Sequence, residues 1–172
     1  MPPRLRTALV AGLVLVAAIV AWRYLTSPER RVLRRLDALM EHLGKEGAES
    51  QLAAAATARG AADFFAPGFL VRAEPYEGQL TDSRELTGAV MRFRGAAQRV
   101  EAAALEPDVR LDETARTAVV HFVGRVAMDG PAGSGTESWR VRSLWIEDGG
   151  EWRISELELL EPIESGGLLP GF

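Results

Sequence analysis

Few residues of this chain have side chains suited to covalent or metal chemistry. The 172 residues include no cysteine, which excludes disulfides, thiolate metal sites and a cysteine nucleophile within this sequence. Only two histidines are present, His42 and His121, so we predict no histidine-based metal centre. His121 lies in an apolar, strand-like run, where burial can tune the pKa of an imidazole. A structural or dimer-interface histidine is the favoured interpretation over a general base.

Arginines on the expected strands are a second feature with chemical potential. Four of them could share one face of a sheet with His121: Arg99, Arg125, Arg140 and Arg142. Such a face could bind an anion or dock a partner, because guanidinium groups bind carboxylates and phosphates in bidentate fashion. The favoured alternative is a solvated outer sheet face whose charge is balanced by Glu101 and Glu137.

Charge and glycine placement argue against phosphate recognition. Residues 1–27 carry three arginines and no acid, so a net charge of −4 leaves −7 on the remaining residues. An acidic domain repels phosphate backbones, and we expect no nucleic-acid partner. Gly130, Gly133 and Gly135 fall between expected strands, whereas a phosphate-binding glycine loop joins a strand to a helix. We predict no bound cofactor.

The N-terminus carries a hydrophobic segment. Sixteen uncharged residues run from Thr7 to Trp22, a helix of about 24 Å, against a hydrocarbon core of roughly 30 Å that flanking arginines could help to span. A cleaved signal peptide is the alternative, but Ile19-Val20-Ala21 is a poor cleavage site. A buried core helix is disfavoured, since the segment is apolar on every face. We expect an uncleaved single-pass anchor that binds the lipid bilayer through residues 7–22.

This anchor divides the chain into three parts. We expect an N-terminal tail and anchor in residues 1–26, one soluble domain in residues 27–161 and a flexible C-terminal tail in residues 162–172. Arginines lie on both sides of the span, and a literal positive-inside count keeps the domain cytoplasmic. Short N-terminal tails commonly stay inside, however, and the preferred expectation is an extracytoplasmic domain.

Helical periodicity and capping residues predict three helices in the domain. Ser27 and Pro28 begin the first, which Gly44 ends. Ser50 caps the second, an alanine-rich helix from Gln51 to about Phe65. Asp82 and Glu85 form a capping box for the third, which runs toward Ala97 with Leu86, Val90 and Phe93 on one face. Phe69–Val71 is a possible short strand.

A period of two then predicts four consecutive strands. The expected runs are 98–105, 116–128, 137–147 and 151–160. Glu106-Pro107-Asp108, Asp129-Gly130-Pro131 and Asp148-Gly149-Gly150 supply the turns between them. Short links imply an antiparallel meander, and helices followed by a sheet imply an α+β fold with the helices on one face.

This order of elements resembles the nuclear transport factor 2-like superfamily, which includes ketosteroid isomerase-like and SnoaL-like proteins. The most typical stretch is Leu144–Ile154, a strand, a glycine hairpin and a second strand with Trp152 and Ile154. Together with the expected anchor, this makes the chain a membrane-anchored bacterial member of the superfamily. The resemblance implies a cone-shaped domain, in which three helices pack on a curved antiparallel sheet of about four to five strands. It also implies a pocket and frequent dimers. The expected inward row of one strand is Ala118, Val120, Phe122, Val126 and Met128.

The resemblance also suggests where chemistry would lie. Isomerases of this superfamily use an acidic base with a tyrosine or a protonated acid, and Asp63 and Tyr76 are the available candidates beside His121. Neither lies in a motif that matches a catalytic member, so a solvent-facing Asp63 and a packing Tyr76 are the favoured interpretations. The expected ligand pocket is lined by Phe64, Phe69, Phe93, Val120, Phe122 and Trp139.

Two functions from different classes follow. The first is a membrane-tethered, non-catalytic binding or assembly domain for an unknown protein partner or small apolar ligand, with a possible homodimer through the exposed sheet face. The second is a small isomerase-, cyclase- or dehydratase-like enzyme with a hydrophobic pocket that uses Asp63 or Tyr76. An acid buried in the pocket and facing Tyr76 would favour the enzyme. A pocket filled by phenylalanines would favour the binding domain.

Overall fold

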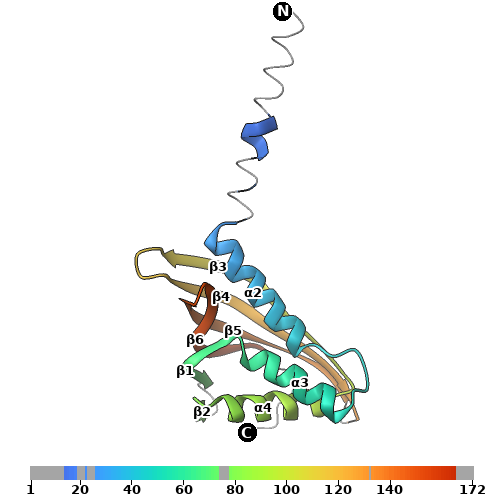
Figure 1. Cartoon of the computed structure of the whole chain (residues 1–172). Helices are drawn as coiled ribbons and strands as arrows, with labels where there is room; N and C mark the ends of the chain where they lie inside the picture. The colour runs from blue at the N-terminus through green and yellow to red at the C-terminus, as the bar shows by residue number, and fades with distance from the viewer. Residues whose placement is uncertain (1–13, 19–21, 23–25, 74–77, 132, 166–172) are drawn as a thin grey trace, which may run out of the picture.

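The computed structural model describes residues 14–18, 22, 26–73, 78–131 and 133–165 and has the predicted α+β architecture (Figure 1). Its helices lie on one side of a curved six-stranded sheet of order β2-β1-β6-β5-β4-β3. All neighbours pair antiparallel except β1 and β6, which are parallel. The elements are α2 (Pro28–Leu43), α3 (Gln51–Ala62), β1 (Phe65–Ala73), β2 (Gly78–Leu80), α4 (Ser83–Gly95), β3 (Arg99–Asp112), β4 (Thr117–Gly130), β5 (Gly133–Asp148) and β6 (Glu151–Ser165).

The predicted caps begin the helices. Ser27 Oγ accepts a hydrogen bond from Arg30 N at the start of α2, and Asp82 accepts bonds from the backbone at the start of α4. The second helix ends at Ala62, three residues before the expected Phe65. The reason is that Ile154 N donates to Phe64 O at 2.8 Å, which ties the chain to β6 from this point.

Two expected breaks lie inside strands. Glu106-Pro107-Asp108, predicted as a turn, is a bulge in β3, where the register with β4 shifts between Leu105 and Asp108. Proline is tolerated there because β3 is an edge strand. The predicted breaker at Pro67-Gly68 is likewise an irregularity within β1, whose register shifts between Phe65 and Leu70. With β1 and the unpredicted short strand β2, the sheet has six strands where four to five were expected.

The strand ends also differ from the expectation. β5 begins at Gly133, because Gly130 pairs with Gly133 directly across the hairpin. β6 continues to Ser165, since Glu137 and Ser138 of β5 offer backbone partners to Ser165 and Glu164. Residues 162–165, assigned above to a loose tail, are therefore in a strand, and residues 166–172 lie outside the described part.

Alternate residues of the long strands form the core. The inward row of β4 is as predicted, with Ala118, Val120, Phe122 and Met128 buried and Val126 packed against the cluster that contains Met128. Trp145 and Ile154 on the neighbouring strands are fully buried under the helices. Each such side chain contributes about 1.5–3 kcal/mol through the area that it removes from water.

Among the described residues, we find no helix that is both long and apolar enough for a membrane span. The expected anchor, residues 7–22, falls mostly outside them. Only residues 14–18 and Trp22 of this segment are described, in helical conformation.

One buried polar contact in the sheet gives a test of the core. Ser143 is fully buried and accepts a hydrogen bond from Trp145 Nε1 at 2.8 Å. Ser143→Ala leaves that indole N–H without an acceptor, so we expect the free energy of unfolding to fall by about 1–3 kcal/mol in urea titrations. Ser155→Ala is the matched control, because Ser155 is only half-buried and donates to Leu144 O. Equal stability of the two variants would contradict this role of Ser143.

Candidate functional site

The helices and the inner face of the sheet enclose an apolar cavity of about 230 Å³. Residues of α2, α3 and α4 line one side of it, and residues of β1 and β3 to β6 line the other. Its main side chains are Leu39, Leu43, Leu86, Val90, Phe122, Trp139, Val141, Leu157 and Leu159. No carboxylate, histidine or tyrosine is found in the lining among the described residues. Arg125, which also borders it, belongs to the outward row of β4 and is exposed.

A missing side chain makes room for this cavity. Gly124 is the inward position of β4 directly opposite Trp139. A Cβ at Gly124 would lie 3.2 Å from Val141 Cγ2, so a larger residue here would take up part of the cavity and shift the Val141 side chain slightly. The Trp139 indole N–H points to Glu137 Oε2 at 3.5 Å, and the ring therefore offers hydrocarbon to the cavity.

The predicted pocket residues separate into two groups. Phe122 and Trp139 line the cavity. Phe64, Phe69 and Val120 do not, because they are buried within the core, where at most 4% of each residue is exposed. Phe93 packs instead against a second cluster around Ala97, Val100 and Met128.

The catalytic candidates are not brought together. Asp63 caps the C-terminus of α3, is exposed and is absent from the cavity lining. His121 lies on the outer face of the sheet, opposite Arg142 and Asp108 on the neighbouring strands. Tyr76 lies outside the described residues. Within the described ranges, no group of three or more acidic or histidine side chains could hold a metal ion.

The outer face of the sheet is a ladder of ion pairs. Arg142 lies across from His121 and pairs with Glu158 at 3.0 Å, and Arg72 pairs with the same carboxylate at 3.0 Å. Arg140 pairs with Glu161. The positive charge of this face is therefore balanced by carboxylates, as predicted. Glu101 is one of them and pairs with Arg99, but Glu137 is not, because it is buried on the inward side of the sheet.

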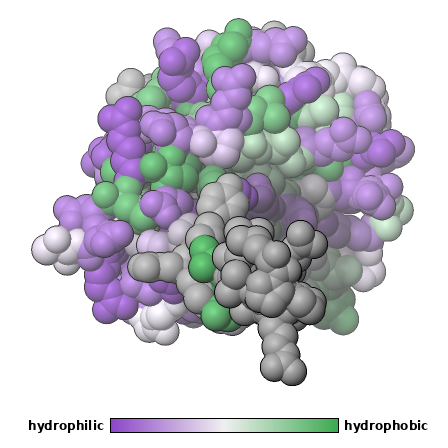
Figure 2. All heavy atoms as spheres, turned by 90° about the horizontal axis from the view of Figure 1, so that it is seen from above, coloured by the Kyte–Doolittle hydropathy of each residue, from purple (hydrophilic) through white to green (hydrophobic). Residues whose placement is uncertain are grey.

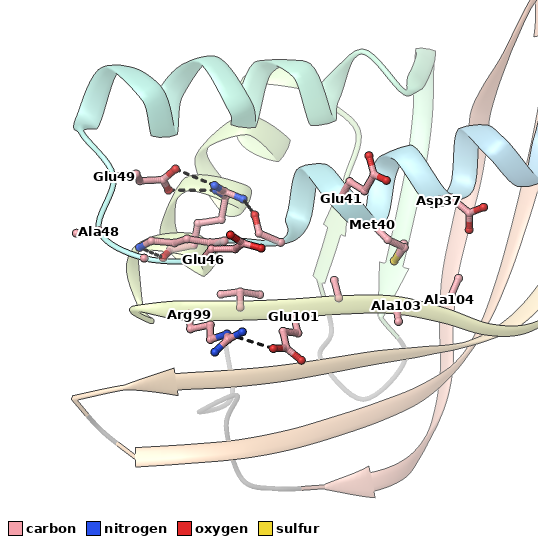
Figure 3. Close-up of a pocket in the computed structure, with 16 residues that line it drawn as sticks. Asp37, Met40, Glu41, Glu46, Ala48, Glu49, Arg99, Glu101, Ala103 and Ala104 are labelled. Atoms are coloured by element: carbon pink, nitrogen blue, oxygen red, sulfur yellow. Dashed lines mark hydrogen bonds and ion pairs between the residues drawn. The ribbon is translucent and has the colours of Figure 1, made fainter.

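A second hollow, a groove of about 860 Å³, lies where the loop after α2 meets β3 (Figure 3). Its back wall contains a buried arginine, Arg94 of α4, of which 4% is exposed. The guanidinium binds both carboxylate oxygens of Glu49, at 2.7 and 3.2 Å. It also donates to the carbonyl oxygens of His42, at 2.8 Å, and of Gly44.

Sequence reasoning missed Arg94, although a signal was present. Leu86, Val90 and Arg94 follow one another at intervals of four, which places an arginine in the buried stripe of α4. A buried charge needs a partner, and the hydrogen bonds from Arg94 hold the pKa of Glu49 below its ordinary value despite partial burial of the carboxylate.

Solved structures show which fold this is. A nuclear transport factor 2-like protein with a cystatin-like fold from Novosphingobium aromaticivorans has a TM-score of 0.59 and 15% identity, over 91% of this chain and 97% of that chain. A candidate scytalone dehydratase from the same organism has a TM-score of 0.64 and 12% identity, over 79% and 84%. The chain has the nuclear transport factor 2-like fold.

A third similar structure supports the same conclusion. ActVI-ORFA from Streptomyces coelicolor has a TM-score of 0.62 and 12% identity, over 78% of this chain and 97% of that chain. Identities at this level show the nuclear transport factor 2-like fold alone, since the fold hosts many unrelated functions. No protein-family model and no curated protein matches the sequence.

The ion pair of Arg94 gives a test of the site's framework. Glu49→Ala leaves a buried guanidinium without its carboxylate, and we expect a loss of roughly 3 kcal/mol in the free energy of unfolding at pH 7. Because the folded-state pKa of Glu49 lies below the ordinary 4.5, its contribution is complete above that pH and is lost as the pH falls below it.

Chemical unfolding measured between pH 7 and pH 3 checks both statements. Glu46→Ala is the matched control, because Glu46 is an exposed acid of the same loop and should change stability by less than about 0.5 kcal/mol. A Glu49→Ala variant as stable as Glu46→Ala would contradict the structural role of the ion pair. So would a Glu49→Ala variant that loses as much stability between pH 7 and pH 3 as the wild-type chain does.

Proposed function

We propose that this chain is a membrane-tethered, non-catalytic binding domain whose apolar cavity takes a small apolar ligand. The observation that carries the proposal is the lining of the cavity, in which aliphatic and aromatic side chains surround the space and no described acid, histidine or tyrosine enters it. Such a surface binds by the hydrophobic effect and offers no group for proton transfer.

The size of the cavity narrows the ligand class. An apolar cavity of about 150 Å³ already accepts benzene, so 230 Å³ suits a ligand of one or two rings or a short stretch of acyl chain. Phe122, Trp139 and Leu159 of the sheet would contact the ligand from one side, and Leu43 and Val90 of the helices from the other. A homodimer through the outer sheet face stays part of the proposal, because the helices cover only the other face (Figure 1).

The enzyme alternative needs an acid inside the cavity. Asp63, its main candidate, is exposed at the end of α3. The similar structure described as a candidate scytalone dehydratase shares the fold at 12% identity, which does not transfer its activity. Tyr76, the other residue that the enzyme alternative could use, lies outside the described residues.

Filling the cavity tests ligand binding. Gly124→Leu places a side chain in the space beside Trp139. We expect it to weaken the binding of an apolar probe by about tenfold or more, because the probe can then bury much less apolar surface in the cavity. The probe is bromobenzene, whose bromine quenches tryptophan fluorescence, titrated into the full chain in lipid nanodiscs. Partition of the probe into lipid is the same for both chains and cancels in the comparison.

Two further variants separate filling from damage. Val123→Leu enlarges an outward neighbour on the same strand and should leave quenching unchanged. Val90→Phe fills the cavity from α4 and should reproduce the effect of Gly124→Leu without touching β4. Identical quenching of the wild-type chain and both filled variants, with circular dichroism showing all of them folded, would exclude the cavity as a ligand site.

The tether rests on the apolar N-terminal segment. Its described side chains are exposed, with 62% of Val14, 62% of Leu15 and 71% of Trp22 accessible, so nothing in the domain buries them. The domain face seen from this end is largely hydrophilic, with separate apolar patches (Figure 2). Arg31, Arg34 and Arg35 of the first turns of α2 line a hollow at this end beside Trp152. A polar end of this kind suits a position at the bilayer surface.

Removal of residues 1–26 tests the tether. We expect the full chain to stay in the membrane fraction of a bacterial host after carbonate washing and the shortened chain to be released. Val14→Arg with Val16→Arg is the matched control of equal length, because each arginine in a span costs about 2.5–3.5 kcal/mol of insertion energy.

Protease treatment of intact spheroplasts then reads the orientation. Digestion of the domain from outside supports the extracytoplasmic placement proposed here, and protection until lysis contradicts it. Retention of the shortened chain on washed membranes would contradict the tether itself.

A further inference from the structure

The first strand of the meander, β3, has one free edge. β3 pairs with β4 on one side and is the last strand of the sheet on the other. At its beginning this edge is covered by the loop after α2, where Lys45 N donates to Val100 O at 2.8 Å and Val100 N donates to Lys45 O at 2.9 Å. The backbone N–H and C=O of Val100 therefore point away from β4.

Antiparallel geometry predicts which other residues of β3 have backbone groups that point away from β4. Successive residues of an edge strand direct their backbone groups alternately to the neighbour and to the free side. The register is regular from Val100 to Leu105, so Ala102 and Ala104 also present their N–H and C=O groups to the free edge. Within the described residues, neither has a backbone hydrogen bond on that side.

The open stretch has two defined ends. Lys45 occupies the edge at Val100, and beyond Leu105 the bulge at Glu106 and Pro107 interrupts the ladder. Native edge strands are usually blunted by lysine, proline or bulges. Between these blocks the middle of the edge has three small side chains, Ala102, Ala103 and Ala104, which leave the backbone accessible.

The groove of Figure 3 lies along this stretch. It is lined by inward Ala102 and Ala104 and also by outward Ala103, so it opens on the edge of the strand and not on one face. Asp37 and Met40 of α2 form its opposite wall (Figure 3). Its volume of about 860 Å³ leaves room for an extended peptide segment.

The groove carries an excess of negative charge. Five carboxylates and three cationic side chains line it. Glu49 is bound to Arg94, and Glu101 is paired with Arg99. The other three acids are exposed and have no ion-pair partner among the described residues: Asp37, Glu41 and Glu46.

We propose that the edge of β3 from Glu101 to Leu105 accepts an extended, positively charged segment of a partner protein as a seventh strand. Its backbone would pair with Ala102 and Ala104, and its lysines or arginines would reach the carboxylates of α2 and the following loop. A second copy of this chain is a poorer occupant, because edge-to-edge pairing would bring both sets of unpaired acids together.

Binding of designed peptides to the full chain in nonionic detergent tests the proposal. The probe is a fluorescein-labelled, terminally blocked peptide of alternating lysine and threonine, seven residues long, and the control peptide has glutamate at each lysine position. We expect saturable binding of the lysine peptide in fluorescence anisotropy, weakened by salt, and no binding of the glutamate peptide. Hydrogen exchange should slow in residues 101–105 when the lysine peptide is bound.

Two variants separate the backbone from the charges. Ala102→Pro removes an N–H that the fold does not use, so it should weaken binding by about tenfold or more with little loss of stability, as edge strands accept proline at such positions. The triple variant Asp37→Asn, Glu41→Gln, Glu46→Gln should weaken binding by about tenfold and reduce its salt dependence. Glu161→Gln, on the outer face of β6, is the charge control and should bind normally.

Several outcomes would overturn the proposal. Equal binding of the two peptides excludes charge recognition, and full binding to Ala102→Pro excludes strand addition even if the triple variant fails. If the lysine peptide does not bind at millimolar concentration, both charge recognition and strand addition are excluded. Protection of residues 101–105 that grows with protein concentration in the absence of peptide would assign the edge to a second copy of the chain. Gly124→Leu should bind the lysine peptide normally, since Gly124 lines the apolar cavity and not the groove, although Met40 and Ala102 border both.

Discussion

The buried guanidinium of Arg94 is the contact on which the arrangement of the helices depends. It joins α4 to the end of α2 through the carbonyl oxygens of His42 and Gly44, and to the following loop through Glu49. A charge removed from water costs several kcal/mol unless it is fully paired, and here each of its nitrogens has a partner. The same contact forms one wall of the groove and holds α2 and α4 over the apolar cavity.

The sheet explains why the two hollows differ so strongly. Its inner face is largely apolar because the helices cover it, and the missing side chain at Gly124 leaves an apolar space among the described residues. Its outer face can carry ion pairs such as Arg142 with Glu158 because water screens them there. The groove at the edge of β3 meets neither condition, and backbone and carboxylate groups therefore remain available in it.

Local patterns in the sequence predicted the elements that local forces determine. The period of two in β4 correctly assigned Ala118, Val120 and Phe122 inward and His121 outward, and the caps at Ser27 and Asp82 marked two helix starts. The parallel pairing of β1 with β6 was missed, because it joins segments far apart in the chain. The contact of Arg94 was missed although the arginine lies in a buried stripe, and its partner, 45 residues away, could not be named from that pattern. Pro107 was predicted to lie in a turn. A strand tolerates proline there only because β3 is at the edge of the sheet, and the sequence does not show which strand is at the edge.

The central claim is that the cavity under the helices is a dry, apolar binding space without acid–base chemistry. A crystal structure of the chain under xenon pressure tests it most directly, since xenon enters empty apolar cavities and ordered water enters polar ones. The account predicts xenon density between Trp139, Phe122 and Leu159. Ordered water in that space, bound to a carboxylate or to the hydroxyl of Tyr76, would contradict it.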